Sequence, residues 1–328
     1  MIGSMTAVVM QAPGGPDVLQ PVVRPIPQPD ANEVLIQVHA FGLNRSELFT
    51  RQGHSPGVRF PRILGIEAVG TVAEAPGRQF SPGETVATVM GGMGRSFDGS
   101  YAEYLVVPAV QVRSVLTALP WRTLGALPEM LQTAWGALFR SLRLAPGDRL
   151  LIRGGTTSVG LAAAAIARAH GAEVGATSRS AGAAEVVKAA GANHFFLDDG
   201  AIAEKVRGVW RGGADKVLEM VGTNTLVDSL QATQEPGIVC MAGMVGDHWT
   251  FPQFAPMDII PTGVSLTTYS GTAEDFMSMP FQALVDQIEA DRLPIPLGPI
   301  FPFDQLARAH TLREQSRPGE KMVLGTRC

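Results

Sequence analysis

The sequence predicts an α/β protein in which a doubly wound parallel sheet is joined to an irregular β barrel. Two observations support this prediction. Residues 1–120 are rich in proline and glycine and contain short strand-forming runs separated by turns. From Gly147 to Gly246, strand-like runs alternate with helix-like segments, which is typical of a parallel sheet with helices on both faces. The length of 328 residues suffices for two domains.

Individual strands are expected where apolar and β-branched residues gather between glycine and proline turn signals. In the barrel these ranges are 6–9, 33–38, 68–73, 85–89 and 104–107. In the second part we expect strands over 150–153, 172–177, 194–197, 214–220 and 237–242. The helices between them are expected over 159–170, 181–190, 201–210 and 225–231.

The residue composition of the chain changes again beyond residue 264. Apolar residues lie at helical spacing at Phe276, Phe281, Leu284, Val285 and Ile288. A proline-rich stretch then leads to a short helix over 304–313 and a closing strand over 321–325. Because its short strands and prolines resemble those of the barrel, we expect this part of the chain to return to the barrel domain. The expected domains are residues 1–122, 123–264 and, back in the first domain, 265–328.

Composition excludes several classes of protein. The formal charge is −4 and no run of Lys or Arg occurs, which disfavours nucleic acid and anionic membranes as partners. The two cysteines, Cys240 and Cys328, form no CxxC pair, so we expect neither a disulfide framework nor a zinc ribbon. The N-terminus lacks the pattern of a secretory signal, and no apolar run reaches ~18 residues. We therefore expect a soluble, cytoplasmic protein with a small-molecule partner.

The glycine-rich segment GGTTSVG, Gly154 to Gly160, lies between an expected strand and an expected helix. A pyrophosphate needs close backbone approach and the free amides of a helix N-terminus. This context predicts a dinucleotide-binding turn, although Thr157 takes the place of the usual middle glycine. The alternative is a plain tight turn between a strand and a helix.

The end of the next strand selects between the two nicotinamide cofactors. An acidic residue there would bind a ribose 2′-hydroxyl and repel a 2′-phosphate. The chain instead has Ser178 and Arg179, whose hydroxyl and guanidinium suit a phosphate. NADPH is therefore predicted over NADH. Alternatively, Arg179 is only a solvated loop residue.

Six further segments occur in order along nearly the whole chain. They are GLNRSELFTRQG (42–53), PRILGIEAVGTV (61–72), FDGSYAEYLVVP (97–108), PEMLQTAWGAL (128–138), RGGTTSVGLAAAAIA (153–167) and GEKMVL (319–324). Together they resemble the medium-chain dehydrogenase/reductase superfamily and, within it, the zinc-free, zeta-crystallin-like quinone oxidoreductases. The resemblance implies a GroES-like barrel, a Rossmann domain and a homodimer that pairs edge strands, for which residues 264–269 are the candidate.

The resemblance also marks where zinc-dependent members of the superfamily hold their metal. The three ligand positions match Asn44, Ile66 and Glu129 in this chain. Isoleucine is no ligand and an asparagine amide is a poor one, whereas tetrahedral zinc needs three protein ligands plus water. We therefore expect no catalytic metal.

Without a metal to polarise an alcohol, hydride transfer to an already activated acceptor is the expected reaction. A quinone or an α,β-unsaturated carbonyl can delocalise the charge that it receives. Asn44 is the expected hydrogen-bond donor to the acceptor oxygen, or alternatively only fixes a turn. Glu129 is a candidate proton donor, but it could instead pair with Arg45 or cap a helix at Met130. Glu67 is expected to pair with a basic residue.

Other residues match cofactor contacts of the family. They are Thr133, Val221, Ala242, Gly243, Met244, Thr267, Thr268 and Tyr269, together with the turn residues Gly155, Thr156, Thr157, Ser158 and Val159 and the strand-end residues Ser178 and Arg179. Packing at the edge of the sheet is the alternative for the first group. Two other functions stay open: an alcohol dehydrogenase that recruits zinc in another way, and a non-catalytic NADPH-binding protein, either crystallin-like or a redox sensor.

Overall fold

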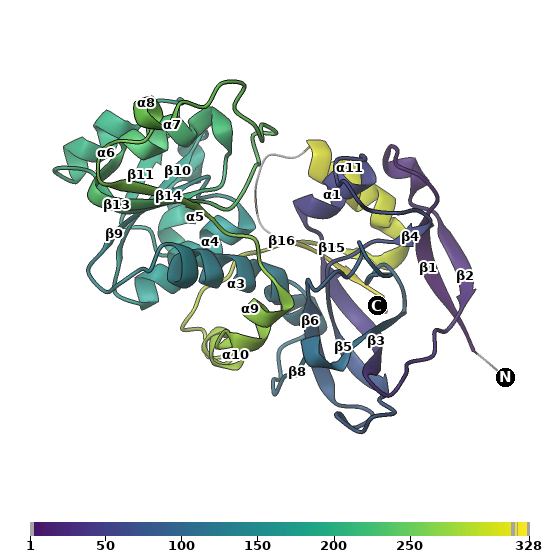
Figure 1. The fold of residues 1–328 in the computed structure, drawn as a ribbon. Helices are drawn as coiled ribbons and strands as arrows, with labels where there is room; N and C mark the ends of the chain where they lie inside the picture. The colour runs from purple at the N-terminus through teal and green to yellow at the C-terminus, as the bar shows by residue number, and fades with distance from the viewer. Residues whose placement is uncertain (1–2, 316–318, 320, 327–328) are drawn as a thin grey trace.

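The computed structural model describes residues 3–315, 319 and 321–326. It has a domain built on a parallel sheet, at the left of Figure 1, and a barrel domain at the right. The predicted α/β fold, with a barrel and a doubly wound sheet, is confirmed. Within the described residues, no helix has the length and apolar character needed to cross a membrane.

The parallel sheet has six strands in the order β11-β10-β9-β12-β13-β14. Their bounds are β9 Arg149–Arg153, β10 Glu173–Ser178, β11 His194–Leu197, β12 Ala214–Glu219, β13 Thr233–Met241 and β14 Val264–Thr268. The strand order reverses beside β9, and ligands bind outside the carboxyl ends of the strands at such a switch point. Since β14 pairs with β13, the sheet continues beyond residue 264, where we expected the domain to end.

Helices connect these strands. They are α4 Ser158–Ala169, α5 Ala184–Ala189, α6 Ala203–Val209 and α7 Thr223–Gln231. The alanines of α4 up to Ala167 are buried against β9 and against α3, Leu127–Gly136. Small side chains allow this close approach of helix and sheet, which is why all but the last turn of the helix is buried. The predicted strands and helices of this region all occur, with ends shifted by a few residues.

The barrel domain contains a seven-stranded sheet in the order β15-β16-β3-β5-β6-β8, with β7 also paired to β3, and a three-stranded sheet in the order β2-β1-β4. The strands are β1 Ser4–Met10, β2 Pro21–Pro25, β3 Glu33–Gly42, β4 Arg62–Ile63, β5 Glu67–Glu74, β6 Thr85–Val89, β7 Tyr104–Pro108, β8 Val112–Ser114, β15 Leu297–Pro302 and β16 Lys321–Gly325. The last strand, β16, pairs antiparallel with β3 and places Val323 opposite Gly42. This register brings the C-terminal strand beside the segment that follows β3.

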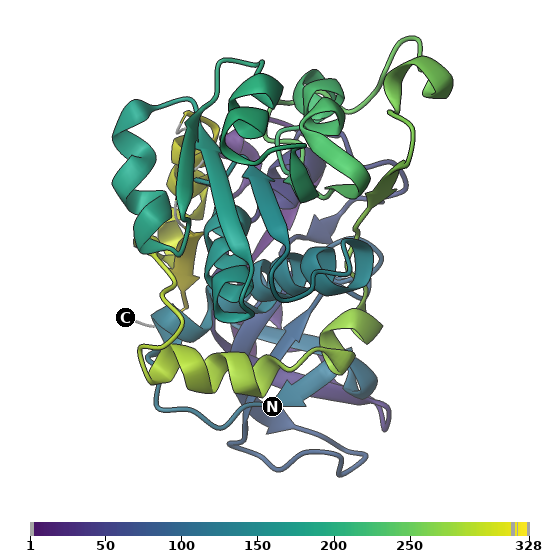
Figure 2. The same ribbon diagram turned by 90° about the vertical axis from the view of Figure 1, so that its left-hand side faces the viewer.

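The remaining helices are α1 Arg45–Arg51, α2 Trp121–Leu124, α8 Pro256–Ile259, α9 Ala273–Ser278, α10 Phe281–Glu289 and α11 Leu306–Gln315. The apolar stretch expected at helical spacing is split into α9 and α10, because Pro280 cannot supply the amide that a continuous helix needs. Both helices pack against α3 (Figure 1, Figure 2). Helices α1 and α11 belong to the barrel domain and lie near the parallel-sheet domain (Figure 1).

Candidate active site

A cavity of about 620 Å³ lies between the barrel domain and the carboxyl ends of the parallel strands. On the barrel side it is lined by residues 43–46, Ile66 and Met90. On the other side it is lined by residues 157–159 at the start of α4 and by residues 241–245 after β13. The cavity therefore lies at the switch point of the sheet, where this fold binds ligands.

Four polar side chains meet at one wall of this cavity: Asn44 and Glu129 line it, and Lys321 and Glu67 lie behind them. The ammonium of Lys321 contacts a carboxylate oxygen of Glu67 at 2.8 Å and one of Glu129 at 3.0 Å. It also donates a hydrogen bond to the side-chain oxygen of Asn44. Lys321 is 2% exposed and Glu67 is fully buried, so the cation and the carboxylates neutralise one another away from water. Glu67 thus pairs with a basic residue, as the sequence predicted.

Asn44 begins α1 and is held on every side. Its backbone amide donates to Glu47 at 3.0 Å, which forms a capping box at the start of the helix. Its side-chain nitrogen donates to Glu67 at 2.9 Å and to Glu47 at 3.2 Å. Both amide hydrogens and the side-chain oxygen of Asn44 are therefore engaged within the protein. The predicted hydrogen bond from Asn44 to an acceptor would require release of one of these carboxylates.

Glu129, in the first turn of α3, lines the cavity. One carboxylate oxygen accepts from Lys321 and the other accepts from the hydroxyl of Thr133 at 3.0 Å. Its own backbone amide donates to Glu67 at 2.8 Å. The expected alternative pairing with Arg45 does not occur, because Arg45 is paired with Asp247 of the other domain.

Burial perturbs the titration of this cluster. Burial, reinforced by the charge of Glu67, raises the pKa of Glu47 to about 8. Burial also raises the pKa of Glu67, against the opposing effect of Lys321. Burial alone would lower the pKa of Lys321, but Glu67 and Glu129 together outweigh it and the pKa is raised. The cluster therefore keeps its ammonium charged, while Glu47 is mostly protonated at neutral pH.

The donors at this place do not fit a zinc ion. Asn44 and Ile66 occupy two of the three positions that matched metal ligands, and the carboxylate of Glu129 at the third is bound to an ammonium. In the part of the chain that the structure describes, no group of three or more His, Cys, Asp or Glu side chains is arranged to hold a metal.

The turn between β9 and α4 has the geometry that a pyrophosphate needs. Gly154 adopts a φ of +81°, which favours glycine. A Cβ on Gly160 would come within 2.7 Å of the carbonyl oxygen of Gly154, so only glycine allows this close approach. Thr157 caps α4 by accepting from the amide of Gly160 at 2.9 Å. The middle threonine is therefore a helix cap that uses the amide of Gly160. Among the described residues, the amides of Ser158 and Val159 in the same turn have no partner and could bind a ligand.

A second cavity, of about 710 Å³, continues from this turn along the ends of β10 and β11. It is lined by Thr156, Ser178, Arg179 and Val221, all of them predicted cofactor contacts. Among the described residues, Arg179 has no hydrogen-bond or ion-pair partner. Its guanidinium is thus free to bind an anion.

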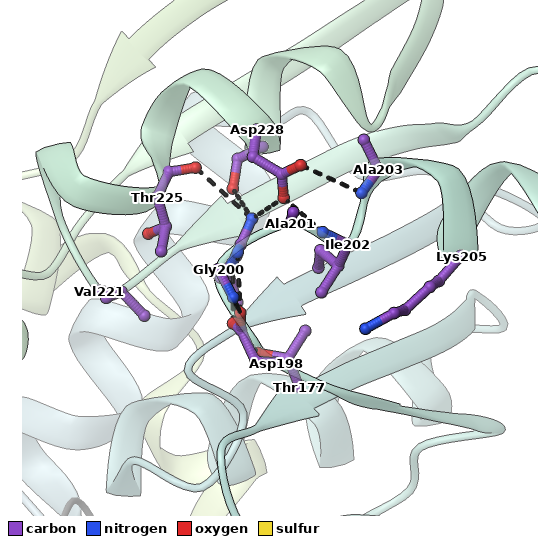
Figure 3. Close-up of polar contacts among 12 residues, drawn as sticks. Thr177, Asp198, Gly200, Ala201, Ile202, Ala203, Lys205, Val221, Thr225 and Asp228 are labelled. Atoms are coloured by element: carbon purple, nitrogen blue, oxygen red, sulfur yellow. Dashed lines mark hydrogen bonds and ion pairs between the residues drawn. The ribbon is translucent and has the colours of Figure 1, made fainter.

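Asp198, after β11, is an acidic residue that the structure adds to this second cavity. Its carboxylate is held by the guanidinium of Arg153 at 2.8 Å and by Thr177 at 3.1 Å. Arg153, 0% exposed, also pairs with Asp228. Figure 3 shows the labelled Asp198 close to Thr177 and Gly200, and Asp228 capping the next helix through the amides of Ile202 and Ala203. The negative charge of Asp198 is therefore neutralised internally.

The structure thus brings most of the predicted site residues to two adjoining cavities. Asn44, Glu129, Thr133, Thr157, Ser158, Val159, Ala242, Gly243, Met244, Thr268 and Tyr269 line the first. Two predicted residues are placed elsewhere. Gly155 packs against Ala176 and donates its amide to Thr177, and Thr267 lines a separate pocket with Arg140. The binding roles of the residues in the two cavities stay predictions.

Sequence reasoning did not find Lys321, Glu47 or Arg153. Lys321 and Arg153 each lie at the end of an apolar strand, and a charged residue in such a strand is seldom buried without a partner. That position was a usable signal for an ion pair. It could not identify the partners, which come from distant parts of the chain.

Comparison with known proteins assigns the family. Residues 30–117 match the alcohol dehydrogenase GroES-like domain family and residues 158–290 match the zinc-binding dehydrogenase family. A quinone oxidoreductase from Sus scrofa is 31% identical, over 98% of this chain and 97% of its own length. The chain belongs to the medium-chain dehydrogenase/reductase superfamily, as a quinone oxidoreductase-like member.

Solved structures of this superfamily match over nearly the whole chain. An NAD-dependent alcohol dehydrogenase is 27% identical with a TM-score of 0.88, covering 98% of this chain and 100% of that one. A mycobacterial protein solved in complex with NADPH is 27% identical with a TM-score of 0.84, covering 98% and 99%. The predicted family is confirmed, and membership supports an oxidoreductase that uses a nicotinamide cofactor.

Proposed function

We propose that this protein is a metal-free oxidoreductase that transfers hydride from NADPH to a quinone or an α,β-unsaturated carbonyl. The observation that supports this most directly is the ammonium of Lys321, which is bound by Asn44 and Glu129, two of the positions that the resemblance matches to metal ligands of zinc-dependent relatives. A fixed ammonium between carboxylates cannot lower the pKa of an alcohol as a metal does. An acceptor that is already activated needs no such help.

NADPH would occupy the two cavities and, when bound, would supply the hydride. The turn at Gly154 to Gly160 would hold its pyrophosphate, and Thr133 and residues 242–244 would line the nicotinamide end. Arg179, with Ser178, would bind the 2′-phosphate. Asp198 would not repel this phosphate strongly, because Arg153 neutralises its charge. This balance of charges supports NADPH over NADH.

Reduction of the acceptor also consumes a proton. A chain of hydrogen bonds runs from Lys321 to Glu129 and from Glu129 to the hydroxyl of Thr133, which lines the cavity. We assign proton delivery to this chain: Thr133 would give its proton to the reduced acceptor and would be reprotonated through Glu129. Lys321 holds Glu129 in place, and Glu129, which lines the cavity, would itself be reprotonated from solvent there.

The test is NADPH oxidation by the purified protein with a panel of quinones and enones, beside NADP⁺ reduction with a panel of alcohols. Metal analysis and a chelator are the controls. We expect oxidation of NADPH that the chelator does not change. Bound zinc with alcohol oxidation would favour an alcohol dehydrogenase with an atypical metal site. Tight NADPH binding with no turnover on any acceptor would favour a non-catalytic NADPH-binding protein.

A further inference from the structure

Arg313, on α11, is a buried arginine whose guanidinium forms no ion pair with any of the described residues. It is 8% exposed and lines the cavity between the two domains. Its Nε is buried without a hydrogen-bond partner, and no hydrogen bond or ion pair joins the side chain of Arg313 to any residue that the structure describes. An unpaired buried guanidinium is costly. A bound ligand of negative charge would supply the missing hydrogen-bond acceptors and offset this cost.

Two neighbours in the same cavity also have unused donors. The Nε of Arg45 and the hydroxyl of Ser46 are buried without a hydrogen-bond partner, and both residues line the cavity. The terminal nitrogen of Arg45 reaches Asp247 instead. Three residues of α1 and α11 that line one cavity therefore each carry a buried donor atom without a partner among the described residues, and two of the three are arginines.

The electrostatics around Arg313 favour an anion. Burial lowers the pKa of Arg313 and the charge of Arg45 lowers it further, while Glu129 acts in the opposite direction. The carboxylate of Glu129 is already bound by Lys321 and Thr133, so it does not satisfy the guanidinium. A carboxylate bound by Arg313 and Arg45 would remove both the desolvation cost and the repulsion between the two cations.

We propose that Arg313, together with Arg45 and Ser46, forms a carboxylate-binding subsite, and that the acceptor is an α,β-unsaturated carbonyl or quinone that bears a carboxylate. This inference rests on the proposed function. The cofactor is the competing source of negative charge, because residues 157–159 of the turn expected to hold its pyrophosphate line the same cavity, whereas its 2′-phosphate would lie in the second cavity. Arg313 comes from the barrel domain and lines the first cavity, not the one along β10 and β11.

The reduction of an enone that bears a carboxylate follows the same steps as the proposed reaction. Hydride forms a carbon–hydrogen bond at the carbon β to the carbonyl, the carbon–carbon π bond opens, and a proton adds to the α carbon. NADPH becomes NADP⁺. The carboxylate takes no part in the chemistry and only orients the acceptor.

The experiment compares two enones that differ at one end, 4-oxopent-2-enoate and pent-3-en-2-one. We expect kcat/KM to favour the carboxylate by about tenfold or more, the value of one charge-assisted bond. Arg313→Met should abolish this preference and leave the neutral enone and the KM for NADPH unchanged, while Arg313→Lys should retain part of it. Arg308→Met, on the exposed face of the same helix, is the control. It should change neither the preference for the carboxylate nor the KM for NADPH.

A binding measurement separates this inference from the proposed reaction. Trp249 lines the same cavity, so its fluorescence should report binding of the saturated keto acid 4-oxopentanoate even if no enone is reduced. We expect saturation with wild-type protein and not with Arg313→Met, whose melting temperature should equal or exceed that of wild type. Equal kcat/KM for both enones, no response to the keto acid, or a rise in the KM for NADPH with both enones alike would each overturn the subsite.

Discussion

The ammonium of Lys321, in the last strand, lies 3.0 Å from the carboxylate of Glu129, in the first turn of α3. The same ammonium lies 2.8 Å from Glu67. This relationship ties the barrel to the helix that forms one wall of the cavity. It also determines the charge behind the wall, because the two carboxylates share one cation.

Replacing Lys321 by Met should destabilise the protein by about 3–5 kcal/mol, because two buried carboxylates lose their counter-charge. Urea unfolding followed by circular dichroism measures this. Combining Lys321→Met with Glu67→Gln removes one orphaned charge and should restore part of the loss. A Lys321→Met protein within about 1 kcal/mol of wild type would contradict the ion-pair account.

Glu129→Gln should lower kcat by about 10- to 100-fold, since it removes one member of the proposed proton chain while keeping its size. The KM for NADPH should stay within a factor of about two. Steady-state kinetics in water and in deuterium oxide check this, and the solvent isotope effect should grow if proton delivery becomes slower. An unchanged kcat would exclude Glu129 from the chain.

Arg179→Ala should raise the KM for NADPH by about 10- to 100-fold, the value of a lost charge-assisted bond to phosphate. The KM for NADH should hardly change, because NADH lacks the 2′-phosphate. Arg168→Ala, at the exposed end of α4, is a matched control. An equal rise in KM for both cofactors would show that Arg179 does not bind the 2′-phosphate.

Glu47 should make stability fall as the pH rises. Its pKa is 4.5 when unfolded and about 8 when folded, so between these values the native state holds a proton that the unfolded chain has released. The free energy of unfolding therefore declines through this window, by up to about 1.4 kcal/mol per pH unit. Glu47→Gln mimics the protonated acid. Its free energy of unfolding, measured with urea, should therefore depend less on pH than that of the wild type across this range. Parallel pH profiles would show that Glu47 titrates normally.

The sequence by itself determined the fold class and the family, and it predicted the dinucleotide-binding turn. These depend on local signals: the alternation of strands and helices from Gly147 to Gly246, and the order of motifs around Asn44 and Gly154. Such signals involve residues near one another in the chain, so they can be read without a structure. The glycines at 154 and 160 were expected for the turn, and the structure adds that Thr157 is a helix cap.

Only the tertiary structure decided which charges meet. Lys321 reaches Glu67 because β16 pairs with β3, and Arg153 reaches Asp198 because β9, β10 and β11 lie side by side. These partners are far apart in sequence, and no local pattern specifies them. The structure likewise decided that Asn44 is engaged on all sides and that Arg313 is left without a partner among the described residues. The free energy of a buried charge depends on what surrounds it in space, and that is known only once the chain is folded.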